Sequence, residues 1–305
     1  MYKNRRIVSI LLIVVSWSYL IYKLCVFDDY NLLFSNLSRL PLHNYIYLAV
    51  ILLLMPLNMF YEVYKWHISV NRVVRQSLGE SLRQVMLGNA GAFITPYRIG
   101  EYPGRAYFLN DKSVFLTAVA LGFVGTLALE IINVGFGLPA SVFYFADSQP
   151  VAVFLSYAFI LICAISLFLL LPKVGKWLKK RNYKDERSRN IIDTLCALDN
   201  RYLFNMLLYS LLRYMTYSVQ LWLALSFFDI ELTSLQALIA IPTYYMLVSV
   251  TPSLPIADAA IRGSWSIVVF QAYTTNTPAI AFAAVLLWLV NTVLPLLILP
   301  FIKKR

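Results

Sequence analysis

The sequence predicts an all-α polytopic membrane protein, with six full transmembrane helices and two re-entrant helical hairpins in an inverted-topology repeat. Three observations predict this fold class. Apolar residues make up 60% of the 305 residues and charged residues only 13%. The apolar residues come in blocks long enough to span a bilayer. Two blocks are broken by similar polar phrases, at residues 95–105 and 251–262, and each phrase opens with Thr-Pro.

The full spans each have the roughly 20 residues that a helix needs to cross a ~30 Å hydrocarbon layer. The first apolar run follows a basic start but is too long for a signal peptide, so we expect it to be retained as a span. The spans need nearly the whole chain, and we expect no soluble catalytic domain. The expected full spans are residues 7–26, 44–64, 113–137, 151–171, 202–228 and 279–301.

The broken segments, residues 83–109 and 236–271, each consist of two half-length apolar pieces joined by a polar turn that contains proline. A half-length helix cannot cross the bilayer, so each segment is expected to enter and leave by the same face. The alternative is that each segment is one kinked helix that crosses the membrane. A polar helical link, residues 65–82, precedes the first broken segment, and a strongly basic link, residues 173–201, follows the fourth span.

The basic residues set the orientation. When the N-terminus is placed inside, the cytoplasmic links carry most of them, whereas the outside links carry only Lys23 and Arg39. This asymmetry is typical of the positive-inside orientation, with both termini in the cytoplasm. The basic residues behind the formal net charge of +11 therefore set the membrane orientation and attract anionic lipid headgroups. We expect no nucleic-acid partner. The basic residues expected in the cytoplasm include Lys65, the cluster from Lys173 to Arg201, and Lys303 to Arg305.

This orientation places the two hairpins on opposite faces of the membrane. The order span–span–hairpin–span then occurs twice, in residues 1–137 and 138–305 of a single membrane domain, 1–305. Inverted repeats of this kind bind their substrate near the midplane, where the repeats meet. We therefore expect a binding site where the hairpin tips approach each other.

The two polar phrases hold matching ion pairs. Glu101 and Arg105 are spaced i,i+4, as are Asp258 and Arg262, which puts acid and base on one helix face. Both acids lie near the N-terminus of a half-helix, where the helix dipole favours anions. The functional hypothesis is a site for a lipid headgroup or an ion. The alternative is that each acid merely caps its helix and neutralises its arginine.

Three more charges lie at membrane depth. Arg98 is a candidate phosphate ligand because guanidinium binds phosphate through a bidentate fork, and snorkelling to the interface is the alternative. Arg213 lies near the middle of its span and Glu130 in the outer half of another. We expect these two to pair with each other or to line the transport path, and a purely structural pair is the alternative. Interhelix hydrogen bonds are expected for Asn58, Glu62 and Gln220.

Signals for catalysis and for bound metals are poor. The three cysteines and two histidines stand apart, which argues against a disulfide framework and a metal site. The sequence has no Ser/His/Asp set and no nucleophile elbow. We therefore expect a transporter without a cofactor, although a lipid-modifying activity stays open. The sequence is compatible with a homodimer.

The first phrase carries a recognisable pattern, Asn89-(x5)-Thr95-Pro-Tyr-Arg-Ile-Gly-Glu101-(x3)-Arg105. It resembles the signature of the transmembrane region of the lysylphosphatidylglycerol synthase/flippase family, and the resemblance covers essentially the whole chain. The preceding segment, with Asn58, Glu62, Lys65 and Trp66, is also similar. The resemblance implies a flippase in the bacterial cytoplasmic membrane that moves a polar-headed lipid between leaflets. The lipid could be a phospholipid, an aminoacyl-phospholipid or a polyprenyl-linked lipid.

Within that resemblance, Arg98, Arg105 and Arg262 are expected to engage phosphate. Glu101 and Asp258 are expected to engage an amine or hydroxyl, or to take up a proton. Synthase members carry a soluble transferase domain after this region, and synthesis is not expected here. The second phrase departs from the family because it has aspartate where many relatives carry glutamate. The rival functions are an ion-coupled transporter of a small solute, a membrane-embedded lipid-modifying enzyme and a non-transporting scaffold.

Overall fold

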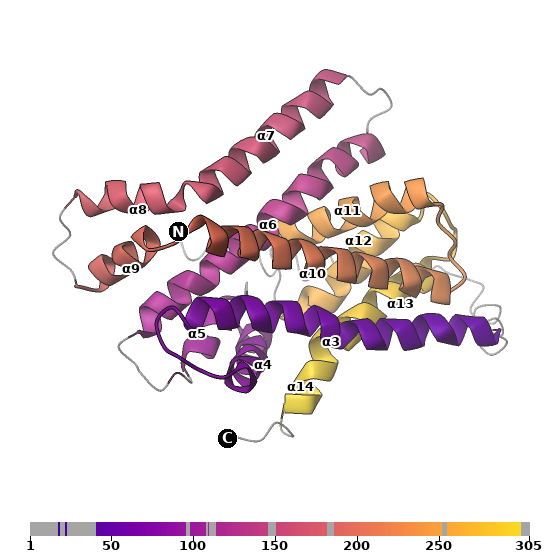
Figure 1. Cartoon of the computed structure of the whole chain (residues 1–305). Helices are drawn as coiled ribbons and strands as arrows, with labels where there is room; N and C mark the ends of the chain where they lie inside the picture. The colour runs from indigo at the N-terminus through magenta and orange to yellow at the C-terminus, as the bar shows by residue number, and fades with distance from the viewer. Residues whose placement is uncertain are drawn as a thin grey trace.

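The structure, a computed structural model, describes residues 18, 22, 41–95, 98–107, 109, 114–145, 151–181, 186–251 and 255–299. Every regular element in this part of the chain is a helix, which confirms the all-α prediction (Figure 1). Apart from residues 18 and 22, the expected first span, 7–26, lies outside the described residues.

Within the described ranges, three helical segments are long and apolar enough to cross a membrane. Two are α3 (Leu42–Val70) and α6 (Phe115–Phe145). The third is the last span, in which α13 (Thr277–Trp288) runs through a π-helical turn, η2 (Leu289–Val293), into α14 (Leu294–Ile298). Each segment overlaps most of a predicted full span. A π-turn widens the helix locally through i→i+5 bonding, and such turns are frequent at functional sites.

The fourth and fifth predicted spans are also helical. α7 (Val151–Leu169) continues into α8 (Leu171–Lys179) after a bend of 51°, and the pair is a fourth candidate span if it is counted as one. α10 (Asn200–Phe227) has nearly the predicted bounds but is less apolar, and it is not among the candidates. The described part of the basic link is mainly helical, and α9 (Glu186–Cys196) packs on α8. Six full spans therefore stay a prediction.

The first broken segment folds as two short helices, α4 (Leu78–Ile94) and α5 (Glu101–Tyr107). Ser77 begins α4 with a capping box, in which its side chain accepts a hydrogen bond from the backbone three residues later. At the turn, Thr95 Oγ1 accepts a 2.8 Å hydrogen bond from the backbone N–H of the fifth residue along. Arg98 has a φ of 55°, in the left-handed region, where the chain reverses. The predicted break at the Thr-Pro phrase is confirmed.

The second broken segment repeats this design as α11 (Ser234–Val250) and α12 (Pro255–Phe270). Thr233 begins α11 with another capping box, and α11 has 17 residues, as α4 does. Pro255 is the first residue of α12, where its missing N–H costs no helical hydrogen bond. Residues 252–254, in the middle of the second phrase, lie outside the described part.

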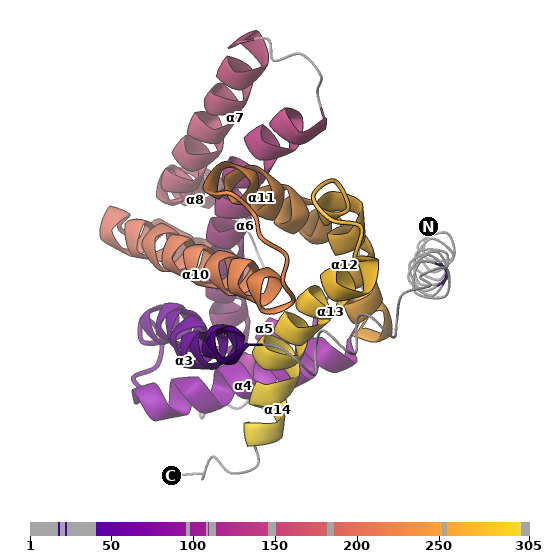
Figure 2. The same ribbon diagram turned by 90° about the vertical axis from the view of Figure 1, so that its right-hand side faces the viewer.

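The helices pack in pairs that are distant in the sequence. Among these pairs, α3 lies along α10 and α6 lies against α11, while α7 projects from the edge of the bundle (Figure 2). α12 packs against α13, the next helix in the sequence. α12 also contacts α4, so the two hairpins touch. Small residues let the helix backbones approach closely, as is usual between membrane helices. The alanines in the largest apolar cluster are Ala224, Ala237, Ala240, Ala260, Ala279, Ala281, Ala283 and Ala284.

Candidate functional site

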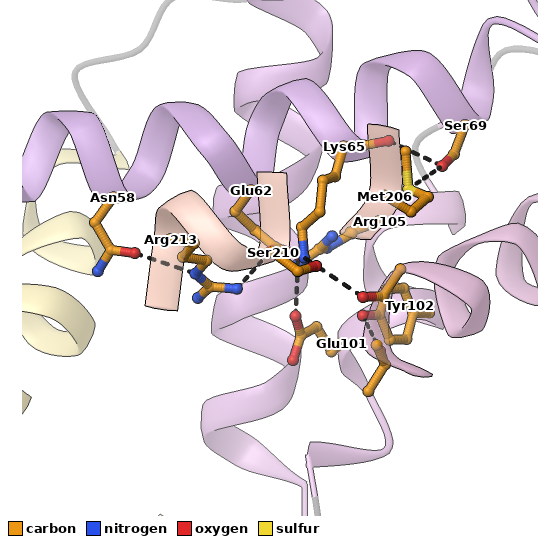
Figure 3. A network of polar contacts seen from close by, with 12 residues as sticks. Asn58, Glu62, Lys65, Ser69, Glu101, Tyr102, Arg105, Met206, Ser210 and Arg213 are labelled. Carbon is orange, nitrogen blue, oxygen red and sulfur yellow. Dashed lines mark hydrogen bonds and ion pairs between the residues drawn. The ribbon is translucent and has the colours of Figure 1, made fainter. Parts of the chain in front are cut away.

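One buried carboxylate, Glu62 in the middle of α3, binds cations from three elements (Figure 3). Its Oε1 lies 2.8 Å from Arg105 Nη2 of α5, and its Oε2 lies 3.1 Å from Lys65 Nζ, one helical turn along α3. Glu62 Oε2 also pairs with Arg213 Nη1 of α10. The carboxylate therefore ties the first hairpin to the α3–α10 pair.

The ion pairs continue into the first hairpin. Arg105 Nη2 lies 2.5 Å from Glu101 Oε1, so the predicted i,i+4 pair forms. Glu101 Oε2 lies 3.2 Å from Arg98 Nη2. Arg98 forms the outer end of the network, because its side chain is 47% exposed whereas that of Arg105 is 1% exposed. The hairpin thus presents an exposed guanidinium that leads to a buried one.

Two features of the hairpin make room for Arg105. Gly88 of α4 faces it, and a Cβ atom at Gly88 would lie 2.3 Å from Arg105 Cγ and 2.6 Å from the carbonyl oxygen of Glu101. The guanidinium carbon lies 4.9 Å from the ring centre of Tyr102 and 5.7 Å from that of Trp66. Both rings favour a cation through their negative faces. A glycine and two aromatic rings therefore hold the buried arginine.

The charges of this network do not balance. The cluster has two carboxylates, Glu62 and Glu101, and four cations, Lys65, Arg98, Arg105 and Arg213, which leaves two positive charges in excess. Two of the cations keep contact with the surroundings of the bundle, because the side chains of Arg98 and Arg213 are 47% and 26% exposed. An anion placed among these cations would offset the excess, and guanidinium groups suit phosphate especially well.

A chain of amides extends the network toward the last span. Asn58 Oδ1 accepts a 3.1 Å hydrogen bond from Arg213 Nε, and Asn58 Nδ2 donates to Asn291 Oδ1 at 2.9 Å. Asn291 lies in the π-turn η2 and donates through Nδ2 to Gln220 Oε1 at 3.0 Å. Gln220 Nε2 donates in turn to the backbone carbonyl of Ile51 at 3.0 Å. The interhelix hydrogen bonds expected for Asn58 and Gln220 are confirmed.

A small polar cavity of about 20 Å³ opens within this chain of contacts. A space of that size holds about one water molecule. The residues that line it include Asn89, the first residue of the sequence signature. The complete lining is Met55, Asn58, Met59, Glu62, Asn89, Arg213, Asn291 and Pro295.

The second phrase forms a separate and balanced site. Arg262 Nε lies 3.2 Å from Asp258 Oδ1, so this i,i+4 pair also forms. Asp258 Oδ2 accepts a 2.9 Å hydrogen bond from Trp288 Nε1, at the end of α13. Thr251, where the phrase begins, accepts a 2.8 Å hydrogen bond from Trp265 Nε1. Trp288 and Asn291, three residues apart in the last span, therefore reach the two polar sites separately.

A model of the family described as lysylphosphatidylglycerol synthase TM region matches residues 7–299. The chain belongs to this family. It is thus a multi-pass membrane protein whose domain is the membrane domain of flippase-like proteins. Comparisons with curated proteins and with solved structures found no match. The family match confirms the resemblance that the first phrase indicates.

In this member of the lysylphosphatidylglycerol synthase TM-region family, sequence reasoning missed the central role of Glu62. The interhelix hydrogen bond expected for Glu62 forms with Arg213 of α10, but the structure also makes Glu62 the common partner of three cations. Lys65 was expected in a cytoplasmic link, but α3 continues to Val70 and buries it. Lys65 Nζ also donates to Ser210 Oγ at 3.3 Å. A local signal existed, because Asn58, Glu62 and Lys65 share one helix face at i,i+4 and i,i+3 spacing.

Glu130 does not pair with Arg213, which binds Glu62 instead. Glu130 lies near Asn133 and Ser249, and it borders an apolar cavity between α6 and α7. The structure therefore brings Arg98, Glu101, Arg105 and Arg213 together, places Asp258 and Arg262 in a second site, and leaves Glu130 apart from both. Among the described residues, no group of three or more His, Cys, Asp or Glu side chains could hold a metal ion.

Proposed function

We propose that this protein is a flippase without enzymatic activity, which moves a phosphate-bearing, polar-headed lipid between the leaflets of a bacterial cytoplasmic membrane. The observation that carries the proposal is the cluster around Glu62, with four cations against two carboxylates. The phosphodiester of a lipid headgroup supplies one of the two missing negative charges. The acyl chains stay in the bilayer while the headgroup passes along the polar cluster.

We also propose the finer topology that the sequence predicts, with both termini in the cytoplasm. Two re-entrant hairpins would enter from opposite faces, in halves 1–137 and 138–305. The first helices of the two hairpins support this topology, since α4 and α11 both have 17 residues and both begin with a capping box. Contact between α12 and α4 brings the hairpins together, as a shared site near the midplane requires. Accessible tags at residues 110–112 and 272–277 would be on opposite faces of the membrane.

The geometry suggests how the headgroup is received. Arg98 is exposed and meets the phosphate first, and Arg105 and Arg213 lie deeper. Because Glu62 already pairs with these two guanidinium groups, an incoming phosphate competes with Glu62 for them. This competition lets the anion bind without becoming trapped. In the second site, the carboxylate of Asp258 accepts a hydrogen bond from an amine or hydroxyl of the headgroup, or takes up a proton.

The test is a headgroup-translocation assay in proteoliposomes, with several fluorescent phospholipids and purified protein. Glu101→Gln and Asp258→Asn are compared with wild type and with Glu231→Gln, a control at an exposed loop position outside both sites. We expect translocation in wild type and in the control, and a marked loss in the two site variants. Equal movement in all four proteins would refute the site assignment. Movement no faster than in empty liposomes, for every lipid class, would refute the flippase proposal.

The same preparation separates the rival functions. Uptake of a soluble phosphate compound without lipid movement would instead identify a solute transporter. A chemical change of the lipid by purified protein in detergent would identify an enzyme.

A further inference from the structure

A cavity of about 200 Å³ lies between α6 and α7, outside the two polar sites. Its lining is apolar with the single exception of Glu130. Two lining residues, Leu127 and Ile160, are 49% and 47% exposed, so the cavity opens on the outer surface of the bundle. The other lining residues are Ile131, Val134, Gly135, Leu138, Pro139, Leu161 and Ala164.

The surface around this opening is suited to hydrocarbon. α6 is a membrane-span candidate, and α7 contains no charged residue. Large apolar side chains are exposed on both helices near the opening, including Phe123 on α6 and Leu155 and Phe159 on α7. In a membrane protein, this surface faces acyl chains. An apolar cavity that is continuous with such a surface is open to the bilayer and takes an alkyl chain.

Behind the cavity, polar contacts lead toward the cationic cluster. Glu130 lies near Asn133, whose Oδ1 accepts a 2.5 Å hydrogen bond from Tyr217 of α10. Tyr217 lies one helical turn from Arg213 on α10. The hydrogen bond from Tyr217 to Asn133 therefore links α6, beside the cavity, to the helix that carries Arg213. On the other side, Glu130 contacts Ser249, two residues before the second phrase.

We propose that this cavity is a lateral binding site for a bilayer phospholipid. One acyl chain fills the cavity, and a carboxyl oxygen of Glu130 accepts a hydrogen bond from an N–H or O–H group of the headgroup. We also assign the cavity as the entrance through which the lipid reaches the polar cluster, and this part of the inference rests on the proposed flippase function. Lipid binding at the cavity does not itself depend on transport.

The binding experiment uses photo-crosslinking in liposomes with phospholipids that carry a diazirine on one acyl chain. The labelled peptides are mapped by mass spectrometry. We expect labels on residues 127–139 and 160–164. Ala164→Phe fills the cavity from the α7 side and is expected to abolish these labels. Ala158→Phe is the matched control, because Ala158 is on α7 but does not line the cavity. Labelling that is equally strong in Ala164→Phe and wild type would overturn the site.

The headgroup contact has its own readout. Phosphatidylethanolamine has N–H donors and phosphatidylcholine has none, so wild type is expected to label more strongly with the ethanolamine probe. One hydrogen bond corresponds to a preference of about two- to tenfold. Glu130→Leu is expected to remove the preference, and Glu130→Gln to keep part of it through the amide oxygen. A preference that persists in Glu130→Leu would overturn the assigned role of Glu130.

The entrance is tested by transport with the same variants. If the cavity is the entrance, Ala164→Phe slows lipid translocation and Ala158→Phe does not. Normal translocation in Ala164→Phe, together with lost labelling, would overturn the entrance assignment and leave the flippase proposal intact. If the expected residues are labelled but no protein, including wild type, translocates lipid, the flippase proposal is refuted and the lipid site stands.

Discussion

Neutralising Glu62 tests whether one carboxylate holds the central cluster together. Glu62→Gln keeps the shape of the side chain but removes the partner of Lys65, Arg105 and Arg213. The excess positive charge rises from two to three, and Lys65 and Arg105 remain at 3% and 1% exposure. Removing one partner of a buried ion pair typically costs about 3–5 kcal/mol. We expect a loss of at least that size, because the change affects three pairs at once.

The measurement is thermal unfolding of purified protein in detergent, followed by circular dichroism. For a chain of this size, each kcal/mol lowers the midpoint by about 2–4 °C, so the expected shift is roughly 6–20 °C. Glu231→Gln is the control, because that side chain is exposed in a loop. A second change, Lys65→Met in the Glu62→Gln background, removes one uncompensated cation and should restore part of the loss. A shift no larger than that of Glu231→Gln would refute the central role of Glu62.

Three further predictions follow from the same geometry. Gly88→Ala should destabilise the protein by about 1–3 kcal/mol in the same unfolding assay, because the new Cβ meets the Arg105 side chain and the backbone of Glu101. Gly79→Ala is the control and should not destabilise the protein, because the nearest atom to its new Cβ is 4.0 Å away. Asn291→Ala leaves two buried amide groups without their partner, and chemical unfolding should detect a loss of about 1–3 kcal/mol; no change would show that the amide chain is unimportant. Arg213→Lys keeps the charge but cannot reproduce the guanidinium fork, so lipid translocation should fall even though the cluster keeps its net charge.

The sequence predicted the helical elements well because their signals are local. Hydropathy blocks marked α3, α6 and the last span, and the Thr-Pro phrases marked the breaks in both hairpins. The i,i+4 pairs at Glu101 and Asp258 were found for the same reason, since spacing within one helix is visible in the sequence.

The central cluster could not be predicted in this way. Glu62 meets Arg105 and Arg213, which come from other helices, and the sequence does not show which faces of α3, α5 and α10 point toward one another. The pairing of Arg213 with Glu130, one of the two alternatives, was wrong because it rested only on both charges lying inside full spans. Burial of Lys65 was missed because basic residues near the end of a span usually mark the interface. In this protein, α3 continues to Val70 and carries Lys65 into the bundle.

The π-turn in the last span determines the directions in which nearby side chains point around the helix axis. Trp288, just before the turn, is fixed by Asp258 of the second hairpin, whereas Asn291, within it, is fixed by Asn58 and Gln220. Each residue of an α-helix advances by about 100° around the axis, so one residue inserted or deleted at Leu289–Val293 would rotate the following segment by that angle. Both side chains face their partners only while the residues of this turn keep their number. The rotation of this one helix therefore couples the position of the Asp258–Arg262 pair to that of the cluster around Glu62.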